Sequence, residues 1–167
     1  MTIEELAARH RRIALDANAF IYLFEAGGPL ARATAAIVDM AESGRISIVV
    51  SSMVLAEIGV GPVAADDATM AERYGQALCE TRGLDVVPLT ADIALDVAVI
   101  RGRDHIEIAD AVHLATARHA GATSHAGQFQ WMAIFEAQTA ASARMLPTAK
   151  SIPPETITSV IPQARMP

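Results

Sequence analysis

The segment RRIALDANAFIYLFEAGG, from Arg11 to Gly28, passes from a strand pattern to a helix pattern at one acidic residue. Ile13 to Leu15 predict a short buried strand, and Asn18 to Ala26 predict a helix that ends at a Gly-Gly pair. Asp16 stands between the two elements. It either caps the helix or belongs to a group of acids that the fold gathers at the carboxyl ends of its strands.

Strand and helix patterns continue to alternate downstream, which is typical of a mostly parallel sheet with covering helices. RISIVVSS (Arg45–Ser52) and LDVVPL (Leu84–Leu89) predict two further strands, the first of them covered on both faces. Helices are predicted from Pro29 to Gly44, from Met53 to a stop at Gly61 and Pro62, before Gly83, from Ala91 to Arg101 with Thr90 as N-cap, and from Glu107 to Ala120. The fold class is therefore α/β.

The regular alternation ends after Gly121. ATSHAGQ (Ala122–Gln128) has no apolar run, so the sequence indicates no fourth strand there. FQWMAIFEAQTAASARM (Phe129–Met145) fits a helix or a strand, and TITSVI (Thr156–Ile161) is at most an edge strand. No internal repeat or long linker divides the chain. We therefore expect a single domain over residues 1–167, with an atypical C-terminal segment from about residue 122.

Length and composition indicate one compact globular domain. The chain has 167 residues, of which 52% are hydrophobic and 19% charged, so neither disorder nor a fibrous repeat is expected. Apolar runs such as Ile46–Val50 are too short to cross a bilayer. Glu4 and Glu5 stand where a secretion signal would carry basic residues, which favours a cytoplasmic protein. Cys79, the single cysteine, is predicted to be a small buried residue on a helix.

The charge of the chain limits how it can meet nucleic acid. The formal net charge is −6, so any contact with a polyanion must be local. Two groups of arginines stand out, Arg9, Arg11 and Arg12 near the N-terminus and Arg101 and Arg103 before the last predicted helix. Both are expected to be solvated surface residues, with Arg101 and Arg103 as candidates for phosphate contacts.

Three acids lie where the chain enters a helix: Asp16, Glu57 and Asp110. Ligands of parallel sheets bind beyond the carboxyl ends of the strands, so Asp16 and Glu57 are expected at the binding edge, and Asp110 can join them. Crowded carboxylates repel one another, and Mg²⁺ or Mn²⁺ relieves that repulsion and activates water toward a phosphodiester. Helix capping by Asp16 and a favourable helix-dipole contact by Asp110 remain equally open. His113, one turn after Asp110, is expected to pack beneath the sheet edge or else to face the site.

Three motifs at these acids resemble those of PIN-domain ribonucleases, specifically the VapC-type toxins of bacterial toxin-antitoxin pairs. IALDANAFIYLFE resembles the opening motif of the family, VVSSMVLAEI its second motif, and IEIADAVHLATARHAGA its helix with Asp-Ala followed by Leu-Ala-Thr-Ala. The order and spacing agree from about Ile13 to Ala122. The resemblance implies a three-layer α/β/α fold with a central, mostly parallel sheet.

The resemblance also implies a function and a site. Asp16, Glu57 and Asp110 would be the metal-binding and catalytic acids, Asn18 would support the first of them, and the activity would be Mg²⁺- or Mn²⁺-dependent cleavage of RNA. Such proteins usually form homodimers and are blocked by a cognate antitoxin that inserts a peptide into the acidic groove. An acidic toxin with a basic antitoxin would suit the net charge of this chain.

The chain departs from the family pattern after Gly121. The family carries a fourth acid on a Thr-Asn-Asp type motif, but here Thr123, Ser124 and His125 stand nearest to it, and no Asp or Glu occurs between Asp110 and Glu136. His125 is a candidate for contact with RNA. A catalytically impaired module that retains antitoxin or RNA binding is therefore the alternative function. A haloacid dehalogenase-type phosphatase is disfavoured, because the second Asp of its motif is Asn18 here and Lys150 is poorly placed.

Overall fold

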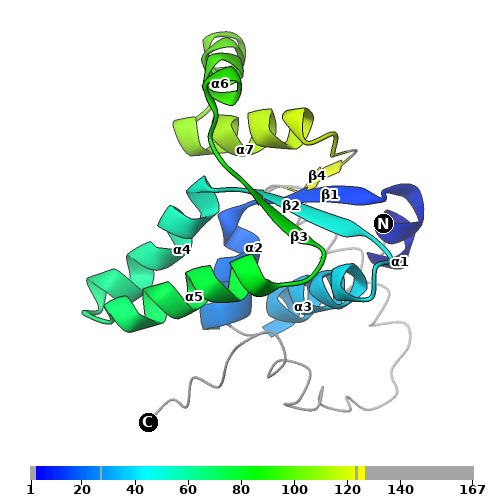
Figure 1. Cartoon of the computed structure of the whole chain (residues 1–167), viewed down its shortest axis with the longest axis vertical. Helices are drawn as coiled ribbons and strands as arrows, with labels where there is room; N and C mark the ends of the chain where they lie inside the picture. The colour runs from blue at the N-terminus through cyan, green and yellow to red at the C-terminus, as the bar shows by residue number, and fades with distance from the viewer. Residues whose placement is uncertain (1–2, 27, 123, 127–167) are drawn as a thin grey trace.

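The computed structural model describes residues 3–26, 28–122 and 124–126. These residues form a four-stranded sheet in the order β3-β2-β1-β4, with every neighbouring pair parallel and helices on both faces (Figure 1). The strands are β1 (Arg12–Leu15), β2 (Ser47–Ser51), β3 (Leu84–Val87) and β4 (Ser124–Ala126). The helices are α1 (Ile3–Arg9), α2 (Ala17–Ile21), the π-helix η1 (Tyr22–Ala26), α3 (Gly28–Glu42), α4 (Met53–Ala64), α5 (Ala68–Glu80), α6 (Ala91–Asp104) and α7 (Ile108–His119). The predicted three-layer α/β/α class is confirmed.

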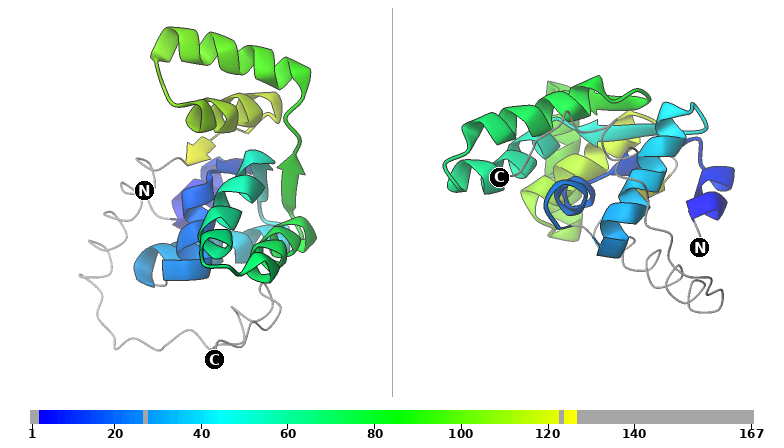
Figure 2. Two further views of the ribbon diagram at one scale, coloured as in Figure 1. Left: turned by 90° about the vertical axis from the view of Figure 1, so that its left-hand side faces the viewer. Right: turned by 90° about the horizontal axis from the view of Figure 1, so that it is seen from below.

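The direction of the connections explains which face of the sheet each helix covers. The chain moves from β1 to β2 to β3 across the sheet and then returns past β1 to β4. Connections between parallel strands are almost always right-handed, so the reversal of direction transfers the connecting helices to the other face. Figure 1 shows α6 and α7 on one side of the sheet and α2 to α5 on the other. In Figure 2, α6 is the outermost element, with α7 between it and the sheet.

The two central strands are buried on both faces, as the sequence predicts for β2. Ile13 and Leu15 in β1 and Ile48 and Val50 in β2 belong to the main core, which α1 to α5 complete. Ile13 is in register with Ile48. The next residues along each strand, Ala14 and Val49, point to the opposite face, toward α7. The central strands therefore form a rigid base from which the loops at their carboxyl ends project.

Helix α4 continues through the predicted stop at Gly61 and Pro62 and ends at Ala64, so that prediction is wrong. Pro62 has no N–H to donate to the preceding turn, which normally breaks a helix. Here Pro62 is buried, its carbonyl accepts from the Asp67 N–H, and the Gly61 carbonyl accepts from the Ala65 N–H. Packing against α5 keeps the last turn in place, so tertiary contacts override the local signal.

A fourth strand is present where the sequence indicated none. β4 pairs with β1 over three residues, with Ala14 opposite His125. A short edge strand needs no apolar run of its own, because the backbone of β1 supplies the partners for its hydrogen bonds. The prediction for Ala122–Gln128 is therefore corrected over Ser124–Ala126.

Two further features differ from the sequence predictions. Helix α1 was not predicted, although Ile3 and Leu6 are buried in the main core and lie on the same face. Cys79 is exposed, because α5 presents Ala77 and Leu78 to the core and turns the next residue outward, so its predicted burial is wrong.

The helices with signals at their ends, α6 and α7, occupy nearly the predicted ranges.

The extent of the domain stays a prediction, because residues 127–167 lie outside the described residues. The segments Phe129–Met145 and Thr156–Ile161, for which alternatives were open, fall within that range. In the part of the chain that is described, no helix is both long enough and apolar enough to span a bilayer.

Candidate active site

Three helices meet beyond the carboxyl ends of β1 and β2. α2 follows β1 and α4 follows β2, each with a single residue between strand and helix. α4 packs against both α2 and α7, and α7 lies across β1 and β2. β1 also lies beside β4, where the order of strands reverses, which is where ligands of open parallel sheets bind. Asp16 is the N-cap of α2, Glu57 lies on α4, and Asp110 lies in the first turn of α7.

Asp16 lies at the carboxyl end of β1 with only 5% of its surface exposed. It is the N-cap of α2, and its Oδ1 accepts a hydrogen bond of 3.3 Å from the Ala19 N–H. Nδ2 of Asn18 lies 3.5 Å from the other carboxylate oxygen, so the predicted supporting residue is next to the acid that it would support. The capping role of Asp16 is confirmed, and it leaves Oδ2 directed toward Asn18.

Glu57 contacts His113, which the sequence predicted either to pack beneath the sheet edge or to face the site. Its Oε2 lies 2.9 Å from Nε2 of His113, joining α4 to α7. The His113 side chain is 3% exposed and that of Glu57 is 32% exposed, so the carboxylate reaches inward from a partly open position to a fixed ring. The spacing of His113 from Asp110 was visible in the sequence, but its contact with Glu57 depends on how the two helices pack.

Asp110 lies in the first turn of α7 and is exposed. Among the described residues, no three His, Cys, Asp or Glu side chains are close enough together to hold a metal ion. The elements that carry the three acids lie in contact. Their carboxylates, however, are not close enough together to bind one ion. A set of oxygen donors from three elements suits a hard dication such as Mg²⁺ or Mn²⁺, so the donor chemistry fits. The assignment of the three acids to a metal site stays a prediction.

The residues predicted to contact substrate take different positions. Nε of Arg101 donates to the Ile106 carbonyl at 3.2 Å, which closes the turn between α6 and α7. Arg103 is exposed in the last turn of α6. The backbone of His125 pairs beside Ala14, close to Asp16 along the neighbouring strand. Arg101 thus has a structural task in the turn that precedes Asp110, and the role of all three in binding stays a prediction.

A further acid, Glu25, lies near this region. It is in the π-helix η1, and a side chain on Gly61 of α4 would approach its Oε1 to 2.9 Å. The pKa of the Tyr74 hydroxyl is raised, first by burial and then by the negative charges of Glu25 and Asp67. Tyr74 also stacks on Phe24 with ring centroids 4.4 Å apart. Aromatic packing and a close glycine therefore hold η1 against α4 and α5.

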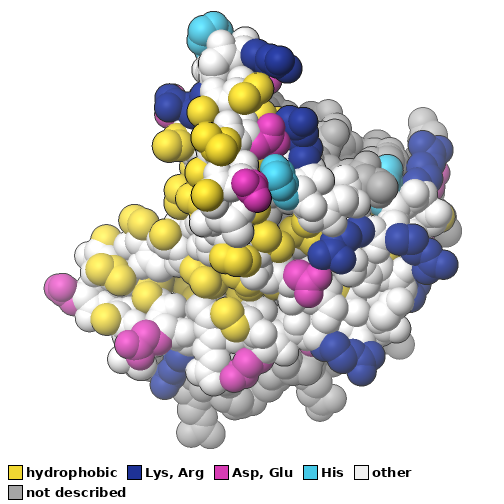
Figure 3. Space-filling view, turned by 45° about the horizontal axis from the view of Figure 1, so that its top comes forward, with side chains coloured by type: hydrophobic (Ala, Val, Ile, Leu, Met, Phe, Trp, Pro, Cys, Tyr) yellow, Lys and Arg dark blue, Asp and Glu magenta, His cyan; other side chains and the backbone are white. Residues whose placement is uncertain are grey.

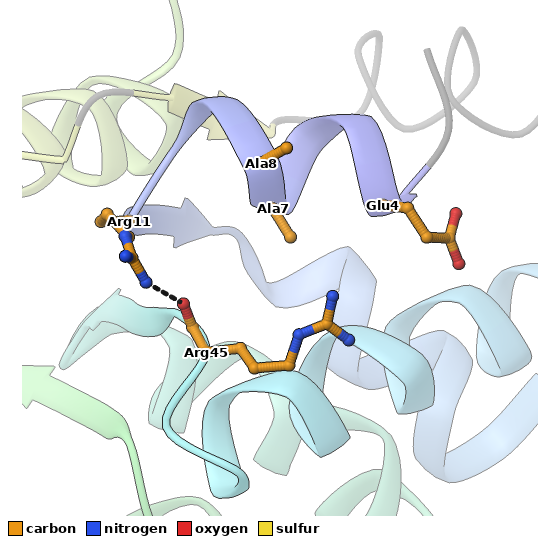
Figure 4. A pocket seen from close by; sticks show the side chains of 5 residues that line it. All are labelled: Glu4, Ala7, Ala8, Arg11 and Arg45. Carbon is orange, nitrogen blue, oxygen red and sulfur yellow. Dashed lines mark hydrogen bonds between the residues drawn. The ribbon is translucent and has the colours of Figure 1, made fainter.

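A hollow of about 300 Å³ lies at the amino ends of β1 and β2, opposite the candidate site (Figure 4). Glu4, Ala7 and Ala8 of α1 line it together with Arg11 and Arg45, which precede β1 and β2. A guanidinium nitrogen of Arg11 donates to the Arg45 carbonyl at 3.2 Å, which ties the two strand starts together. Because the strands are parallel, this arginine-lined hollow is at the end of the molecule away from Asp16.

Comparisons with known proteins agree with this architecture. The family model described as PIN domain matches residues 13–124. A toxin-antitoxin complex from Klebsiella pneumoniae is 20% identical, with a TM-score of 0.50 and coverage of 67% of this chain and 82% of that chain. VapBC2 from Rickettsia felis, bound to a DNA fragment from its promoter, is 16% identical, with a TM-score of 0.55 and coverage of 74% and 92%.

VapC20 from Mycobacterium tuberculosis, a Sarcin-Ricin loop cleaving toxin, is 23% identical, with a TM-score of 0.54 and coverage of 72% and 93%. At these identities the likeness shows a shared fold. A comparison with curated proteins gave no significant match. The family match spans Asp16, Glu57 and Asp110 and ends within β4.

Proposed function

Because the chain belongs to the PIN-domain family, we propose that it is a metal-dependent endoribonuclease and the toxin of a type II toxin-antitoxin pair. The single observation that carries this proposal is the position of Asp16, a nearly buried carboxylate at the carboxyl end of β1, where α2, α4 and α7 meet. VapC20, a Sarcin-Ricin loop cleaving toxin that shares the fold, supports the choice of RNA as the substrate.

Asp16, Glu57 and Asp110 are the residues that would hold the divalent ion, which we propose to be Mg²⁺ or Mn²⁺. When bound, such an ion supplies activation of water and neutralisation of charge at a phosphodiester. Asn18 orients one oxygen of Asp16, and His113 occupies one oxygen of Glu57. Arg101, Arg103 and His125 are proposed contacts for the RNA backbone, because they lie on or near the elements that border the site.

Replacing Glu57 by glutamine tests the role of this acid. The variant keeps the length of the side chain and removes its charge, so we expect Mn²⁺-stimulated RNA cleavage to fall about 100-fold, the scale of losing a few kcal/mol of charge stabilisation. Cleavage of a mixed RNA substrate with and without chelator gives the measurement. Glu80→Gln is the matched control, since Glu80 is an exposed acid on α5 that also accepts a side-chain hydrogen bond. Equal activity of the Glu57 and Glu80 variants would contradict the assignment.

The proposed inhibitor is a cognate antitoxin with a basic segment, in a cytoplasmic complex. The net charge of −6 and the acids near the carboxyl edge of the sheet favour a positively charged peptide there. Two of the solved structures that share the fold are complexes of a toxin with its antitoxin, which supports this kind of partner.

We also propose that the protein forms a homodimer through exposed apolar side chains on α4 and α6. Val60 is 65% exposed and Leu95 is 69% exposed, and Val63, Leu89, Val99 and Ile108 are exposed as well. Figure 3 shows hydrophobic side chains gathered over α6 and over the α4–α5 pair. Contiguous patches of exposed apolar side chains mark sites of protein interaction, and the gathering of these residues over α6 and the α4–α5 pair favours such a patch.

A double change of Val60→Asp and Leu95→Asp is expected to convert the dimer to a monomer, because it places two charges in each copy of an apolar contact. Light scattering coupled to size exclusion measures the mass directly. Ala8→Asp on α1 is the matched control, since Ala8 is exposed at the opposite end of the sheet. An unchanged mass of the double variant, or a monomeric parent protein, would rule out this interface.

The alternative function is a catalytically impaired module that retains antitoxin or RNA binding. It is favoured by the finding that the described acids do not form one group able to hold an ion. Calorimetric titration with Mn²⁺ separates the two functions. Uptake of the ion supports the nuclease, and no detectable uptake at millimolar concentration supports the binding module.

A further inference from the structure

We propose that His113 is a positioning residue that fixes the Glu57 carboxylate for metal binding. This inference rests on the proposed role of Glu57 in the nuclease site. It is carried by a separate observation, the contact of 2.9 Å between Nε2 of His113 and Oε2 of Glu57. The imidazole is not itself assigned to the metal or to the substrate.

The two partners differ in how firmly the fold holds them. His113 is almost completely buried, and the neighbouring residues Ala111, Val112 and Ala115 are buried in the contact between α7 and α6. Burial therefore restricts the movement of its ring. Glu57 is on the partly exposed side of α4, and a glutamate side chain there would otherwise sample several rotamers. Because the contact joins a fixed group to a free one, His113 orients Glu57 and not the reverse.

The hydrogen bonds of the ring indicate that it is kept for this contact. An ionised carboxylate can only accept, so Nε2 of His113 is the donor. Nδ1 is buried and has no hydrogen-bond partner among the described residues. An apolar side chain would fill the same space without leaving a buried polar atom unpaired, so packing alone does not account for a histidine here. The bond to Glu57 is the one favourable use of its polarity that the described residues show.

The contact has a direct consequence for an ion held by Glu57. With Oε2 bonded to His113, Oε1 is the carboxylate oxygen left to bind an ion. Hydrogen bonds from outer residues orient the ligands of metal sites, and their removal typically lowers metal affinity or activity about 10- to 100-fold. His113 therefore lowers the side-chain conformational entropy that Glu57 loses when an ion binds.

Substitution of His113 by glutamine and by asparagine separates positioning from packing. The glutamine amide nitrogen can take the place of Nε2 and donate to Glu57, whereas the shorter asparagine amide cannot reach it. We expect His113→Asn to weaken Mn²⁺ binding about 10- to 100-fold and His113→Gln to retain most of the affinity. Calorimetric titration of the folded variants, checked by circular dichroism, gives this result without any measurement of cleavage. In steady-state assays at fixed Mn²⁺, kcat should fall in His113→Asn while KM for RNA stays unchanged.

His119→Gln is the control, because His119 is on the same helix and contacts Asp96, away from Glu57. Equal Mn²⁺ affinity in the asparagine variant and the parent protein would overturn the inference, as would equal losses in the asparagine and glutamine variants. If His113→Asn does not fold, a loss of affinity in His113→Gln would overturn it and retention would support it. If Glu57→Gln binds Mn²⁺ as the parent does, the metal role of Glu57 fails instead. A loss in Glu57→Gln with none in His113→Asn removes only the role of His113.

Discussion

Asp16→Asn is expected to lower Mn²⁺-dependent RNA cleavage about 1000-fold, equivalent to about 4 kcal/mol of transition-state stabilisation. The variant removes one negative charge from a carboxylate that is nearly buried at the carboxyl end of β1. Asparagine and aspartate are almost equally good N-cap residues, so the bond to the Ala19 N–H and the start of α2 should persist. Thermal unfolding should therefore change little while cleavage is lost.

The chain offers a closely matched control for this substitution. Asp67 is the N-cap of α5 and accepts from the Met70 N–H at 2.9 Å, so Asp67→Asn makes the same chemical change at another helix N-cap. Asp67 is exposed on the loop between α4 and α5. We expect its variant to retain full cleavage. If both variants cleave RNA at the parent rate, Asp16 has only its capping role, and the proposed nuclease site is wrong.

Gly83→Ala is expected to destabilise the protein by about 3 kcal/mol or more. Gly83 precedes β3 with φ of 79°, a conformation that costs an L-residue about 1–2 kcal/mol. A Cβ there would also overlap the Ala41 carbonyl oxygen and lie 2.8 Å from its carbonyl carbon. Backbone of α3 cannot move aside as a flexible side chain can, so the clash adds to the strain.

Gly44→Ala isolates the conformational part of this cost. Gly44 has φ of 74°, and a Cβ there would meet nothing within 4 Å. We expect it to lose about 1 kcal/mol, so urea unfolding should rank the parent, Gly44→Ala and Gly83→Ala in that order of decreasing stability. Equal losses in the two variants would show that the approach of Gly83 to α3 does not limit the packing of β3.

Features with local signals could be predicted from the sequence. Thr90 caps α6 by accepting from the Ile93 N–H, and Gly121 follows α7 with φ of 66°, as the residue types indicated. α1 could also have been predicted, because buried Ile3 and Leu6 are three residues apart and the segment has acids in its first turn and an arginine in its last. In each case the information lies within one or two helical turns.

Features that depend on distant partners could not be predicted. β4 is a strand because β1 offers a free edge, not because Ser124–Ala126 has strand character. α4 passes through Pro62 because α5 packs against it. The bond between Glu57 and His113 joins residues 56 apart in sequence and requires the contact of α4 with α7. The identity of the candidate acids was readable from the sequence, whereas the partner of Glu57 was set by packing.

The described residues form two separate hydrophobic clusters, and the candidate site lies where the elements of the two clusters meet. The larger contains the residues of β1, β2 and α1 to α5, and the smaller joins α6 to α7 through Ile93, Val97, Ile100, Ala111, Val112 and Ala115. Asp16 and Glu57 belong to elements on one side, and Asp110 and His113 to α7 on the other. Undocking of the helical hairpin would dismantle the site while the larger cluster stays intact. The stability of the site is thus set by the free energy of undocking α6 and α7. Such local opening can cost less free energy than global unfolding.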